Sequence, residues 1–379
     1  MKILLYADSP MVATGFATVT RNLHKILSKE HEVTIYAINH HGVYPKNDYE
    51  IIPAVTTAEM MQGEMDIYGL KRLVKTVEGY DVLITINDHF ILGMVGEALR
   101  KACNKHKVKW IGYYPIDSEI TPEWAHTISL ADVPVFYCNY GQKEYKKHVK
   151  GKDGVVIYHG TDCDAFYPIT PRDLAIAKEK YFSHAKGKKL IVNVNRNQPR
   201  KYIPETMMQF KRLLEFRDDV HLYLHMRESD LGYGLTQLAI NIGLPQGTWS
   251  CAGGDVPVEI LNEVYNCADV FFTTHLGEGW GLTVTEAMAT VTPVVVPDNT
   301  SMTEIVEGYK VKPTSWICLG NPDFSRIRPA GGDYLPALNE ALDRPNWDYM
   351  DKNFEFVRKY TWEHVGRQWL ELLSATKQG

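Results

Sequence analysis

The sequence predicts an α/β protein with two doubly wound domains, each a parallel sheet covered by helices. Three observations lead to this prediction. The chain has 379 residues, which is more than one hydrophobic core usually serves. Short apolar runs alternate with segments whose apolar residues recur every three or four positions, as in successive βαβ units. The alternation lapses near residue 161 and restarts at residue 188, so we expect two domains joined by a linker.

The first part of the chain is predicted to form the N-terminal domain, residues 1–165. A helix is expected after the first apolar run, because Phe16, Val19 and Leu23 recur at helical spacing. Residues 166–187 carry prolines and then lysines, and we interpret them as the linker. The strands expected in this domain are 2–7, 31–38, 81–86, 108–114, 133–138 and 154–160.

The second part is predicted to form a C-terminal domain, residues 188–345, followed by C-terminal helices over 346–379. The helical pattern of the tail breaks near Tyr360 and Thr361. We expect the last helix to pack back on the N-terminal domain. The other expected elements are strands 188–195, 220–226, 269–274 and 292–297, and helices 203–217, 233–242 and 256–267.

The composition is that of an ordinary globular protein, with 45% hydrophobic and 23% charged residues. No apolar run approaches the length of a membrane span, and no signal peptide is evident, so we expect a cytoplasmic protein, with peripheral attachment to a membrane left open. The six cysteines form no C-x-x-C pair, which argues against a zinc site and a disulfide framework.

The charge pattern leaves several partners open. The first 160 residues contain 18 Lys and Arg against 18 Asp and Glu, and ten of the basic residues lie in two clusters, 100–109 and 143–152. These lysine clusters would suit an anionic acceptor, a membrane surface or DNA, or they form solvated helix faces. Duplex DNA binding usually needs a larger basic excess than this.

The stretch HLGEGWGLTVTEAMAT, residues 275–290, follows an expected strand and opens a helix. Such a junction presents free backbone N–H groups and the positive end of the helix dipole, so it can bind an anion. Thr283 and Glu286 have the spacing of a capping box, which would give Glu286 a local role. No local structural role is evident for Glu278. The sequence lacks both G-x-x-x-x-G-K-[ST] and a complete G-x-G-x-x-G after the first strand.

A second loop, NVNRNQPRKYIPE at 193–205, also lies between a strand and a helix. Its cations, Arg196, Arg200 and Lys201, oppose the dipole at the start of the helix unless an anion lies between them and the amides. A basic loop and a glycine-rich loop with carboxylates fit a ligand that has both a diphosphate and hydroxyl groups. A nucleotide sugar has this chemistry.

The glycine-rich stretch resembles a known signature. Glu278-x7-Glu286 within EGWGLTVTEAMA is similar to the E-x7-E motif of retaining glycosyltransferases of the GT-B fold, family 4. Four further blocks agree in order: TGFATVTRNL (14–23), GYYPIDSEITPEW (112–124), YHGTDCDAFYP (158–168), and Arg196 with Lys201. The resemblance spans most of residues 1–310 and implies two Rossmann-like domains that face a cleft.

The resemblance also implies roles for individual residues. Arg196 and Lys201 would bind the donor diphosphate, and Glu286 would accept hydrogen bonds from the ribose hydroxyls. Glu278 would face the donor sugar as a catalytic group. The other implied donor-binding residues are Gly15, Gly279, Trp280, Gly281, Leu282 and Thr283, and the candidates for the acceptor side are Asp117 and His126.

The chain departs from the family pattern at three places. Val291 follows EAMA-x where the family usually has glycine. A β-branched residue at positive φ would be strained by roughly 1–3 kcal/mol, so we expect this helix end to be built differently. Asn195 replaces a frequent glycine before Arg196, and Ile116-Asp117 replaces a histidine in the acceptor block.

One motif points to a different chemistry. Asp162-Cys163-Asp164 is a D-x-D, the metal and diphosphate clamp of another glycosyltransferase fold. It lies at the expected domain junction, in a block that the GT-B resemblance already covers, and basic residues already supply charge for a diphosphate. We therefore predict no metal and no cofactor, with the nucleotide sugar as co-substrate.

The predicted function is that of a metal-independent, retaining hexosyltransferase, which moves a sugar from a nucleoside diphosphate sugar to an acceptor hydroxyl. The acceptor is left open between a glycan, a lipid phosphate and a modified DNA base, and the loops do not identify the donor base. The alternatives are a GT-B sugar-nucleotide epimerase and a non-catalytic nucleotide-binding protein, since fold does not fix function.

Overall fold

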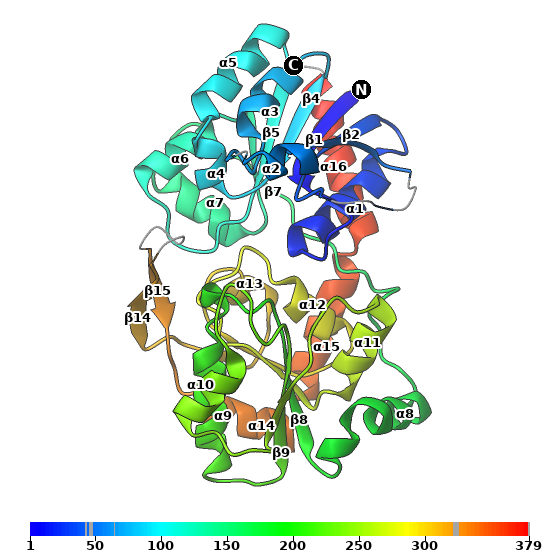
Figure 1. The fold of residues 1–379 in the computed structure, drawn as a ribbon, viewed down its shortest axis with the longest axis vertical. Helices are drawn as coiled ribbons and strands as arrows, with labels where there is room; N and C mark the ends of the chain where they lie inside the picture. Colours follow the sequence, from blue (N-terminus) through cyan, green and yellow to red (C-terminus); the bar gives the residue numbers. More distant parts are fainter. Residues whose placement is uncertain (42–43, 45–47, 64, 321–325, 378–379) are drawn as a thin grey trace. The chain divides into compact units, whose positions relative to one another are not determined.

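The chain folds into two compact α/β units (Figure 1). The computed structural model describes residues 1–379 except 42–43, 45–47, 64, 321–325 and 378–379. Unit 1 consists of Met1–His159 together with Trp362–Gly379, and unit 2 of Gly160–Thr361.

Unit 1 contains a seven-stranded parallel sheet with the order β3-β2-β1-β4-β5-β6-β7. Its five central strands are apolar and mostly buried on both faces, as parallel strands covered by helices must be, whereas the edge strands β3 and β7 are only partly buried. The strands are β1 (Lys2–Asp8), β2 (Glu32–Ile38), β3 (Glu50–Pro53), β4 (Val82–Ile86), β5 (Lys109–Tyr114), β6 (Val133–Phe136) and β7 (Val155–Val156). The helices are α1 (Gly15–Leu27), α2 (Thr57–Met61), α3 (Leu70–Thr76), α4 (His89–Gly93), α5 (Gly96–His106), α6 (Pro122–Ser129), α7 (Asn139–Lys146) and α16 (Trp362–Lys377).

The last helix, α16, packs on unit 1 beside α1, as the sequence predicts (Figure 1). Gly366 permits this approach, because a Cβ at this position would lie 2.8 Å from Cγ2 of Ile26 in α1. Trp369 is fully buried, and its ring meets that of Tyr113 with 5.0 Å between centroids. The chain therefore returns to its first unit after completing the second.

Unit 2 contains a six-stranded parallel sheet with the order β10-β9-β8-β11-β12-β13, and an antiparallel hairpin, β14-β15. Its strands are β8 (Lys189–Val194), β9 (Val220–His225), β10 (Trp249–Cys251), β11 (Val270–Phe272), β12 (Val294–Pro297), β13 (Lys310–Val311), β14 (Ser315–Cys318) and β15 (Ile327–Ala330). Its α-helices are α8 (Pro171–Phe182), α9 (Ile203–Leu214), α10 (Leu235–Ile242), α11 (Val258–Cys267), α12 (Leu282–Ala289), α13 (Met302–Ile305), α14 (Leu335–Asp343) and α15 (Trp347–Lys359), and its 3-10 helices are η1 (Ser183–Ala185) and η2 (Pro199–Lys201).

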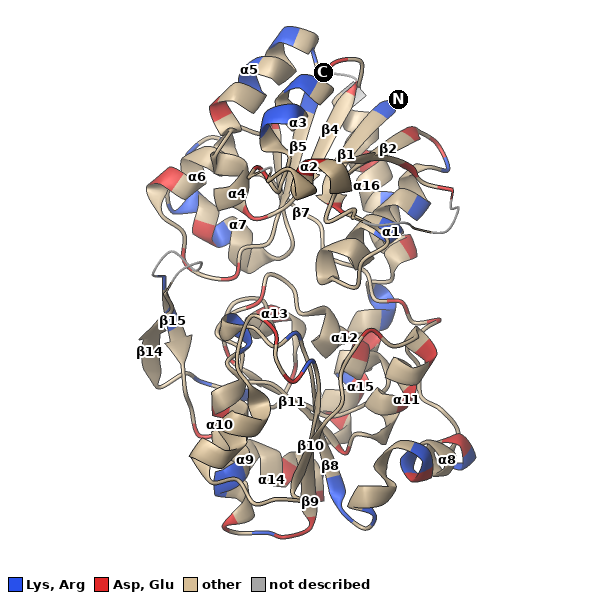
Figure 2. Ribbon diagram, viewed as in Figure 1, with Lys and Arg blue, Asp and Glu red and all other residues tan. Residues whose placement is uncertain are grey.

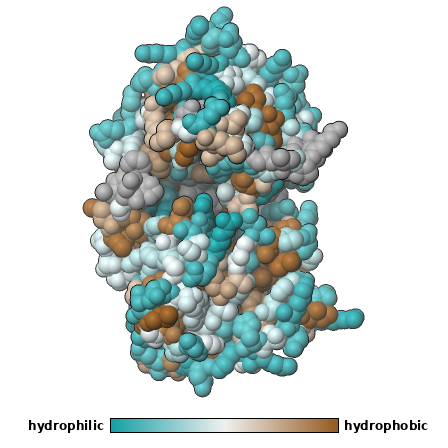
Figure 3. Space-filling model, in the orientation of Figure 1, coloured by the Kyte–Doolittle hydropathy of each residue, from teal (hydrophilic) through white to brown (hydrophobic). Residues whose placement is uncertain are grey.

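The structure confirms the predicted fold class and the break between α15 and α16. The sequence patterns did not predict β3, β10 and β13, because strands of two to four residues show no clear periodicity. They also missed the β14-β15 hairpin, which carries exposed Trp316 and Ile327. Figure 3 shows hydrophobic surface, in brown, over the position of this hairpin. The segment interpreted as a linker contains helix α8.

In the part of the chain that is described, no helix is both long and apolar enough to cross a membrane.

Both sheets have a topological switch point. The strand order reverses between β1 and β4 in unit 1, and between β8 and β11 in unit 2. Loops that leave the carboxyl ends of such a strand pair turn to opposite faces of the sheet, so a crevice opens between them. In a doubly wound sheet this crevice is where ligands bind.

The C-terminal end of α12 corrects one expectation. Val291 has a φ of +59°, so the left-handed conformation is retained although the residue is not glycine. The N–H of Thr292 donates to the carbonyl of Ala287 (3.1 Å), and the N–H of Val291 to that of Met288 (3.1 Å), which is the Schellman pattern. The expectation of a differently built helix end was wrong. The Schellman motif is present, and Val291 occupies its left-handed position in spite of the strain on a β-branched residue there.

Because of this strain, we expect glycine to give a more stable protein than alanine at position 291, which is the reverse of their usual order in a helix. Val291→Gly and Val291→Ala both remove the half-buried side chain, but only glycine adopts positive φ without strain. We expect the glycine variant to be more stable than the alanine variant by about 1 kcal/mol in urea unfolding. As a control, Glu179→Gly should be less stable than Glu179→Ala, because Glu179 lies exposed within α8. Equal stability of the two Val291 variants would contradict this account.

Candidate functional site

The two candidate loops lie side by side at the switch point of unit 2. One follows β8 and leads through η2 into α9, and the other follows β11 and leads into α12. β8 and β11 are neighbouring parallel strands, so both loops leave the same edge of the sheet. The N–H of Leu276 donates to the carbonyl of Arg200 (2.9 Å), which joins the loops through their backbones. The structure thus brings together residues that are about 75 positions apart in the sequence.

Glu278 is buried between two cations of the other loop. Its side chain is 8% exposed, and its Oε2 lies 3.0 Å from Nη1 of Arg200. Its Oε1 accepts a hydrogen bond from Nζ of Lys201, whose side chain is 11% exposed. The interpretation that Glu278 lacks a local structural role was therefore wrong, because its carboxylate pairs with both cations.

Electrostatics keep this carboxyl group ionised. Burial alone would raise the pKa of Glu278, but the positive charges of Arg200 and Lys201, and then that of His275, lower it far below its usual range. A buried carboxylate is tolerated only when it is paired and hydrogen-bonded in this way.

A third segment, after β12, fixes the glycine-rich loop. The N–H of Glu278 donates to Oγ1 of Thr300 (2.9 Å), and the hydroxyl of Ser301 donates to the carbonyl of Trp280 (2.8 Å). Thr300 has a φ of +44°, a conformation that few non-glycine residues adopt. The sequence analysis missed these two residues. Their position after an apolar strand, at the same sheet edge, was the available signal.

Gly281 and Glu286 define the start of α12. Gly281 is the N-cap, with a φ of +101°, and a Cβ there would lie 2.6 Å from Cε of Met302. Thr283 consequently lies inside the first turn and does not cap the helix, so the capping-box interpretation of Thr283 and Glu286 was wrong. Gly279, Trp280 and Leu282 belong to the same turn, where the first N–H groups of the helix lack intrahelical acceptors.

The carboxyl group of Glu286 has a partner on another helix. One of its oxygens accepts a hydrogen bond from the hydroxyl of Tyr265 in α11 (2.7 Å). Burial raises the pKa of Glu286 to about 7, assisted by the negative charge of Asp162 and opposed by Tyr265 and Lys201. Glu286 is therefore poised to change its charge near neutral pH.

Arg196 lies apart from the buried ion pairs. Its side chain is 52% exposed, and its Nε lies 2.8 Å from Oδ2 of Asp230. The hydrogen bond from Arg196 lowers the pKa of Asp230. The cation that adjoins Lys201 beside Glu278 is Arg200, which the sequence places in the turn but which was not selected as a site residue.

In unit 1 the predicted residues are spread over several loops. Gly15 is the first residue of α1, whose N-cap Thr14 accepts a hydrogen bond from the N–H of Ala17 (3.0 Å). Asp117 lies in the turn after β5, and its negative charge contributes to the raised pKa of Tyr140 in α7, for which burial is the largest cause.

His126 is exposed on α6, with its Nε2 3.2 Å from Oε1 of Glu97 on α5. The sequence analysis missed a buried histidine, His89, at the start of α4. Its ring packs 4.9 Å from that of Trp124. The signal was its position three residues after the end of the apolar strand β4.

The D-x-D motif lies at the start of unit 2. Oδ1 of Asp162 accepts hydrogen bonds from the N–H groups of Asp164 (3.2 Å) and Ala165 (3.1 Å), which closes a turn. Among the described residues, no group of three or more His, Cys, Asp or Glu side chains has the arrangement of a metal site. Metal independence stays a prediction.

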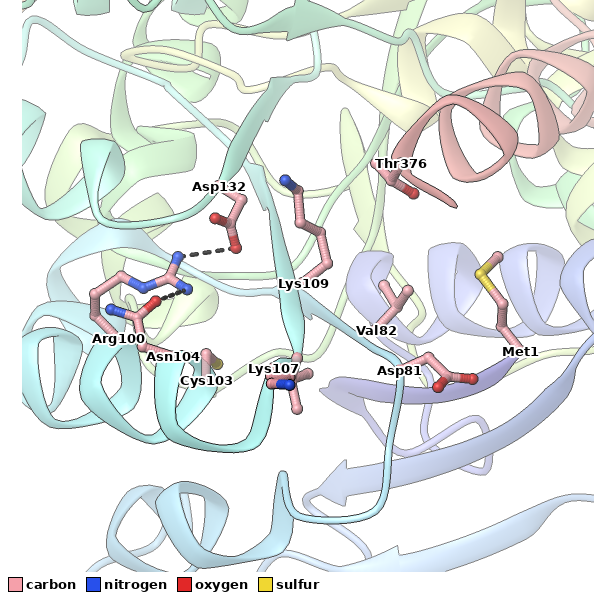
Figure 4. A pocket seen from close by; sticks show the side chains of 11 residues that line it. Met1, Asp81, Val82, Arg100, Cys103, Asn104, Lys107, Lys109, Asp132 and Thr376 are labelled. Carbon is pink, nitrogen blue, oxygen red and sulfur yellow. Dashed lines mark hydrogen bonds and ion pairs between the residues drawn. The ribbon is translucent and has the colours of Figure 1, made fainter. Parts of the chain in front are cut away.

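The lysine cluster at 100–109 lies at the amino edge of the sheet in unit 1 (Figure 4). A groove of about 470 Å³ there is lined by the ends of α5 and by the first residues of β1, β4 and β5. Arg100 pairs with Asp132 (2.8 Å) in this groove, and Lys107 and Lys109 lie nearby. The groove is therefore at the edge opposite the switch point.

Comparison with known proteins agrees with the geometry of unit 2. Residues 177–321 match the family model described as glycosyl transferases group 1, which covers both candidate loops. No curated protein matches the chain.

Solved structures resemble the whole chain in fold. Sucrose-phosphate synthase (tll1590) from Thermosynechococcus elongatus has a TM-score of 0.75 and 18% identity, covering 100% of this chain and 99% of that one. Anabaena Alr3699/HepE in complex with UDP-glucose has a TM-score of 0.73 and 15% identity, covering 99% and 100%. The α,α-trehalose 6-phosphate synthase from Burkholderia multivorans has a TM-score of 0.72 and 14% identity, covering 100% and 99%. These likenesses confirm the GT-B fold, and the family match supports a glycosyltransferase.

The buried carboxylate predicts a specific loss of stability in acid. Glu278→Gln would leave two cations facing each other, so we expect it to lower the free energy of unfolding at pH 7 by about 3 kcal/mol. Because the folded-state pKa of Glu278 is depressed, its contribution is present above the unfolded pKa, about 4.3, and is lost as the pH falls toward the folded value.

Urea unfolding between pH 7 and pH 3 tests this prediction. As the pH falls, the free energy of unfolding of the wild type should decrease more steeply than that of Glu278→Gln. Glu259→Gln, an exposed change in α11, should follow the wild type. Parallel curves for wild type and Glu278→Gln would show that the ion pairs do not stabilise the fold.

Proposed function

We propose that this chain is a retaining glycosyltransferase of family 4 type, which transfers a sugar from a nucleoside diphosphate sugar to an acceptor hydroxyl. The observation that carries the proposal is Glu278, buried with Arg200 and Lys201 at the switch point of unit 2. It stands directly before a helix whose first turns carry Thr283 and Glu286. The match of residues 177–321 to the glycosyl transferase family supports this assignment.

In this proposal, basic side chains and the N-terminus of α12 bind the leaving diphosphate. Breaking the bond between the anomeric carbon and the phosphate oxygen leaves negative charge on that oxygen. Arg196, Lys201 and the N-terminus of α12, near Thr283, would stabilise this charge. A donor diphosphate would compete with Glu278 for Lys201, so binding exchanges one anionic partner for another.

Glu278 and the backbone of residues 279–282 would contact the donor sugar. Glu278 would orient the sugar and stabilise an oxocarbenium-like state without forming a covalent bond. The acceptor oxygen would attack on the face that the diphosphate leaves, and the acceptor proton would pass to the departing phosphate. This path gives retention and requires no protein nucleophile.

The donor base and the acceptor-side residues complete the proposal. UDP is the first candidate base, because Alr3699/HepE was solved with UDP-glucose. Glu286 would bind the ribose hydroxyls, and Gly15 stays a candidate donor-binding residue. Asp117 and His126 stay candidates for the acceptor side. No metal is assigned, because cations and a helix end supply charge for the diphosphate.

Nucleotide binding tests the donor assignment. UDP, GDP and ADP, each with its sugar nucleotide, are compared by thermal unfolding of the full chain. The correct ligand at a hundred times its Kd should stabilise the protein by roughly 2.7 kcal/mol, with or without EDTA. Lys201→Ala and Arg196→Ala should each weaken binding about tenfold or more, since each removes a charged hydrogen bond. Arg212→Ala is the control, because it removes only surface interactions on α9, a pair with Asp333 (3.5 Å) and a hydrogen bond to Oε1 of Gln209 (3.0 Å).

Turnover separates the alternative functions. A transferase releases nucleotide in an acceptor-dependent way and gives a product whose anomeric configuration NMR can assign. An epimerase would change the sugar without an acceptor. A binding protein would show no turnover to lose in Glu278→Ala. Failure of all three nucleotides to stabilise the chain would refute the proposal.

The pKa of Glu286 predicts pH-dependent donor binding. Only the ionised carboxylate accepts hydrogen bonds from ribose hydroxyls with both oxygens. With a pKa of about 7, the affinity for UDP-glucose should fall up to about tenfold from pH 8 to pH 6. Glu286→Gln should bind weakly at both pH values, whereas Glu259→Gln should keep the dependence.

Glu286→Gln should also change how the free energy of unfolding depends on pH. Because the folded-state pKa of Glu286 is raised, its contribution to stability is present below about pH 4.3 and is lost as the pH rises through 7. Glu286→Gln should therefore gain stability relative to the wild type at pH 8 compared with pH 5. Equal differences at the two pH values would rule out the raised pKa.

A further inference from the structure

Arg200 contacts three consecutive residues of the glycine-rich loop. Its carbonyl accepts a hydrogen bond from the N–H of Leu276 (2.9 Å), and its guanidinium donates one to the carbonyl of Gly277. The same guanidinium nitrogen, Nη1, lies 3.0 Å from Oε2 of Glu278. Arg200 therefore holds both the carboxylate of Glu278 and the backbone that leads to it.

The loop that carries Arg200 is itself fixed. The carbonyl of Tyr202, two residues later, accepts a hydrogen bond from the hydroxyl of Thr274 (3.0 Å). The hydroxyl of Thr206 in α9 lies 2.7 Å from that of Thr274, and both threonines are buried. The guanidinium thus extends from a fixed backbone, and no ligand is needed to bring it to Glu278.

The other cation, Lys201, differs from Arg200 in its chemistry. Its ammonium donates a hydrogen bond to Oε1 of Glu278. A guanidinium is a planar fork, and that of Arg200 contacts a carbonyl as well as the carboxylate, whereas an ammonium is a point charge on a flexible stem. Lys201 can therefore turn to another anion while Arg200 stays. Figure 2 shows basic and acidic segments close together among these loops of unit 2, between the labels α13 and β11.

Binding of a diphosphate by Lys201 would take one cation from Glu278. In the described part of the chain, Arg200 and Lys201 are the two cations that form ion pairs with this carboxylate. The side chain of Glu278 is only 8% exposed, so water cannot replace a lost cation. Because a buried carboxylate without a partner is strongly destabilising, donor binding needs a cation that remains beside it.

We propose that Arg200 is a positioning residue for glycosyl transfer, which holds the carboxylate of Glu278 in place while Lys201 binds the donor diphosphate. Arg200 then contributes to nucleotide affinity without contacting the nucleotide. This inference rests on the proposed function, and it gives two adjacent cations different roles: Lys201 exchanges one anion for another, and Arg200 makes the exchange possible.

Nucleotide binding by substituted full-length chains tests this division of roles. The probe is whichever of UDP, GDP and ADP stabilises the wild type most, and its Kd is measured by titration calorimetry. Arg200→Met should weaken binding about tenfold or more, because Lys201 could then bind the diphosphate only by leaving Glu278 without a cation. Arg200→Lys keeps a charge beside the carboxylate, so it should bind the nucleotide more tightly than Arg200→Met does.

A second substitution separates positioning from direct contact. In Arg200→Met/Glu278→Gln no carboxylate competes for Lys201, so the affinity should return to within about threefold of the wild type or exceed it, as strongly coupled residues behave in a double-mutant cycle. Lys201→Ala/Glu278→Gln is the matched control. It should bind as weakly as Lys201→Ala, because it lacks the cation that binds the diphosphate.

Two results would overturn the inference. One is binding by Arg200→Met at the wild-type affinity. The other is binding by Arg200→Met/Glu278→Gln as weak as that of Lys201→Ala/Glu278→Gln, because Arg200 would then contact the nucleotide itself. The second comparison decides the question even if Arg200→Met alone does not fold, since both double variants remove the buried carboxylate.

This inference and the proposed function can fail separately. If none of the three nucleotides stabilises the wild type, the glycosyltransferase proposal is refuted. If the wild type binds a nucleotide and the Arg200 variants give either of the two contrary results, only the role of Arg200 is refuted.

Discussion

The buried contact of Glu278 with Arg200 and Lys201 is the interaction on which the candidate site depends. A carboxylate in this position would be strongly destabilising alone, and so would either cation. The carboxylate compensates part of the positive charge, and the ion pairs hold the glycine-rich loop against the basic loop. The charge that stabilises the fold is also the charge that the proposed chemistry needs, since both an anionic leaving group and a sugar cation require fixed opposite charges nearby.

This contact exists because of strand order. In unit 2, β8 and β11 are neighbours in the sheet although two strands and three helices separate them in the chain. In unit 1, the adjacent parallel strands β1 and β4 bring Asp8 and Asp88 to the same edge of the sheet by the same rule. The two switch points differ in chemistry: the one in unit 2 carries cations around a carboxylate, and the one in unit 1 carries two carboxylates.

Helix α12 has a strained C-terminal end and carries a candidate site residue. It begins at Gly281, where Met302 leaves no room for a side chain, and ends at Val291, which keeps a left-handed conformation against its own preference. The helix between them carries Glu286, whose pKa is raised by burial and moderated by Tyr265. Thr292, just past the helix, donates a hydrogen bond to the carbonyl of the same Tyr265 (3.0 Å). The strained end thus helps to hold the partner of Glu286.

The sequence by itself determined the α/β class, most of the long strands, and the two loops of the candidate site, because apolar periodicity and glycine-rich junctions are local signals. The resemblance to the E-x7-E pattern selected Glu278 and Glu286. Only the tertiary structure decided that Arg200 stands beside Lys201 at Glu278, that Arg196 instead pairs with Asp230, and that Thr300 and Ser301 fix the glycine-rich loop. The physical reason is that such contacts follow from which strands are neighbours in a parallel sheet, and no local pattern along the chain records that order.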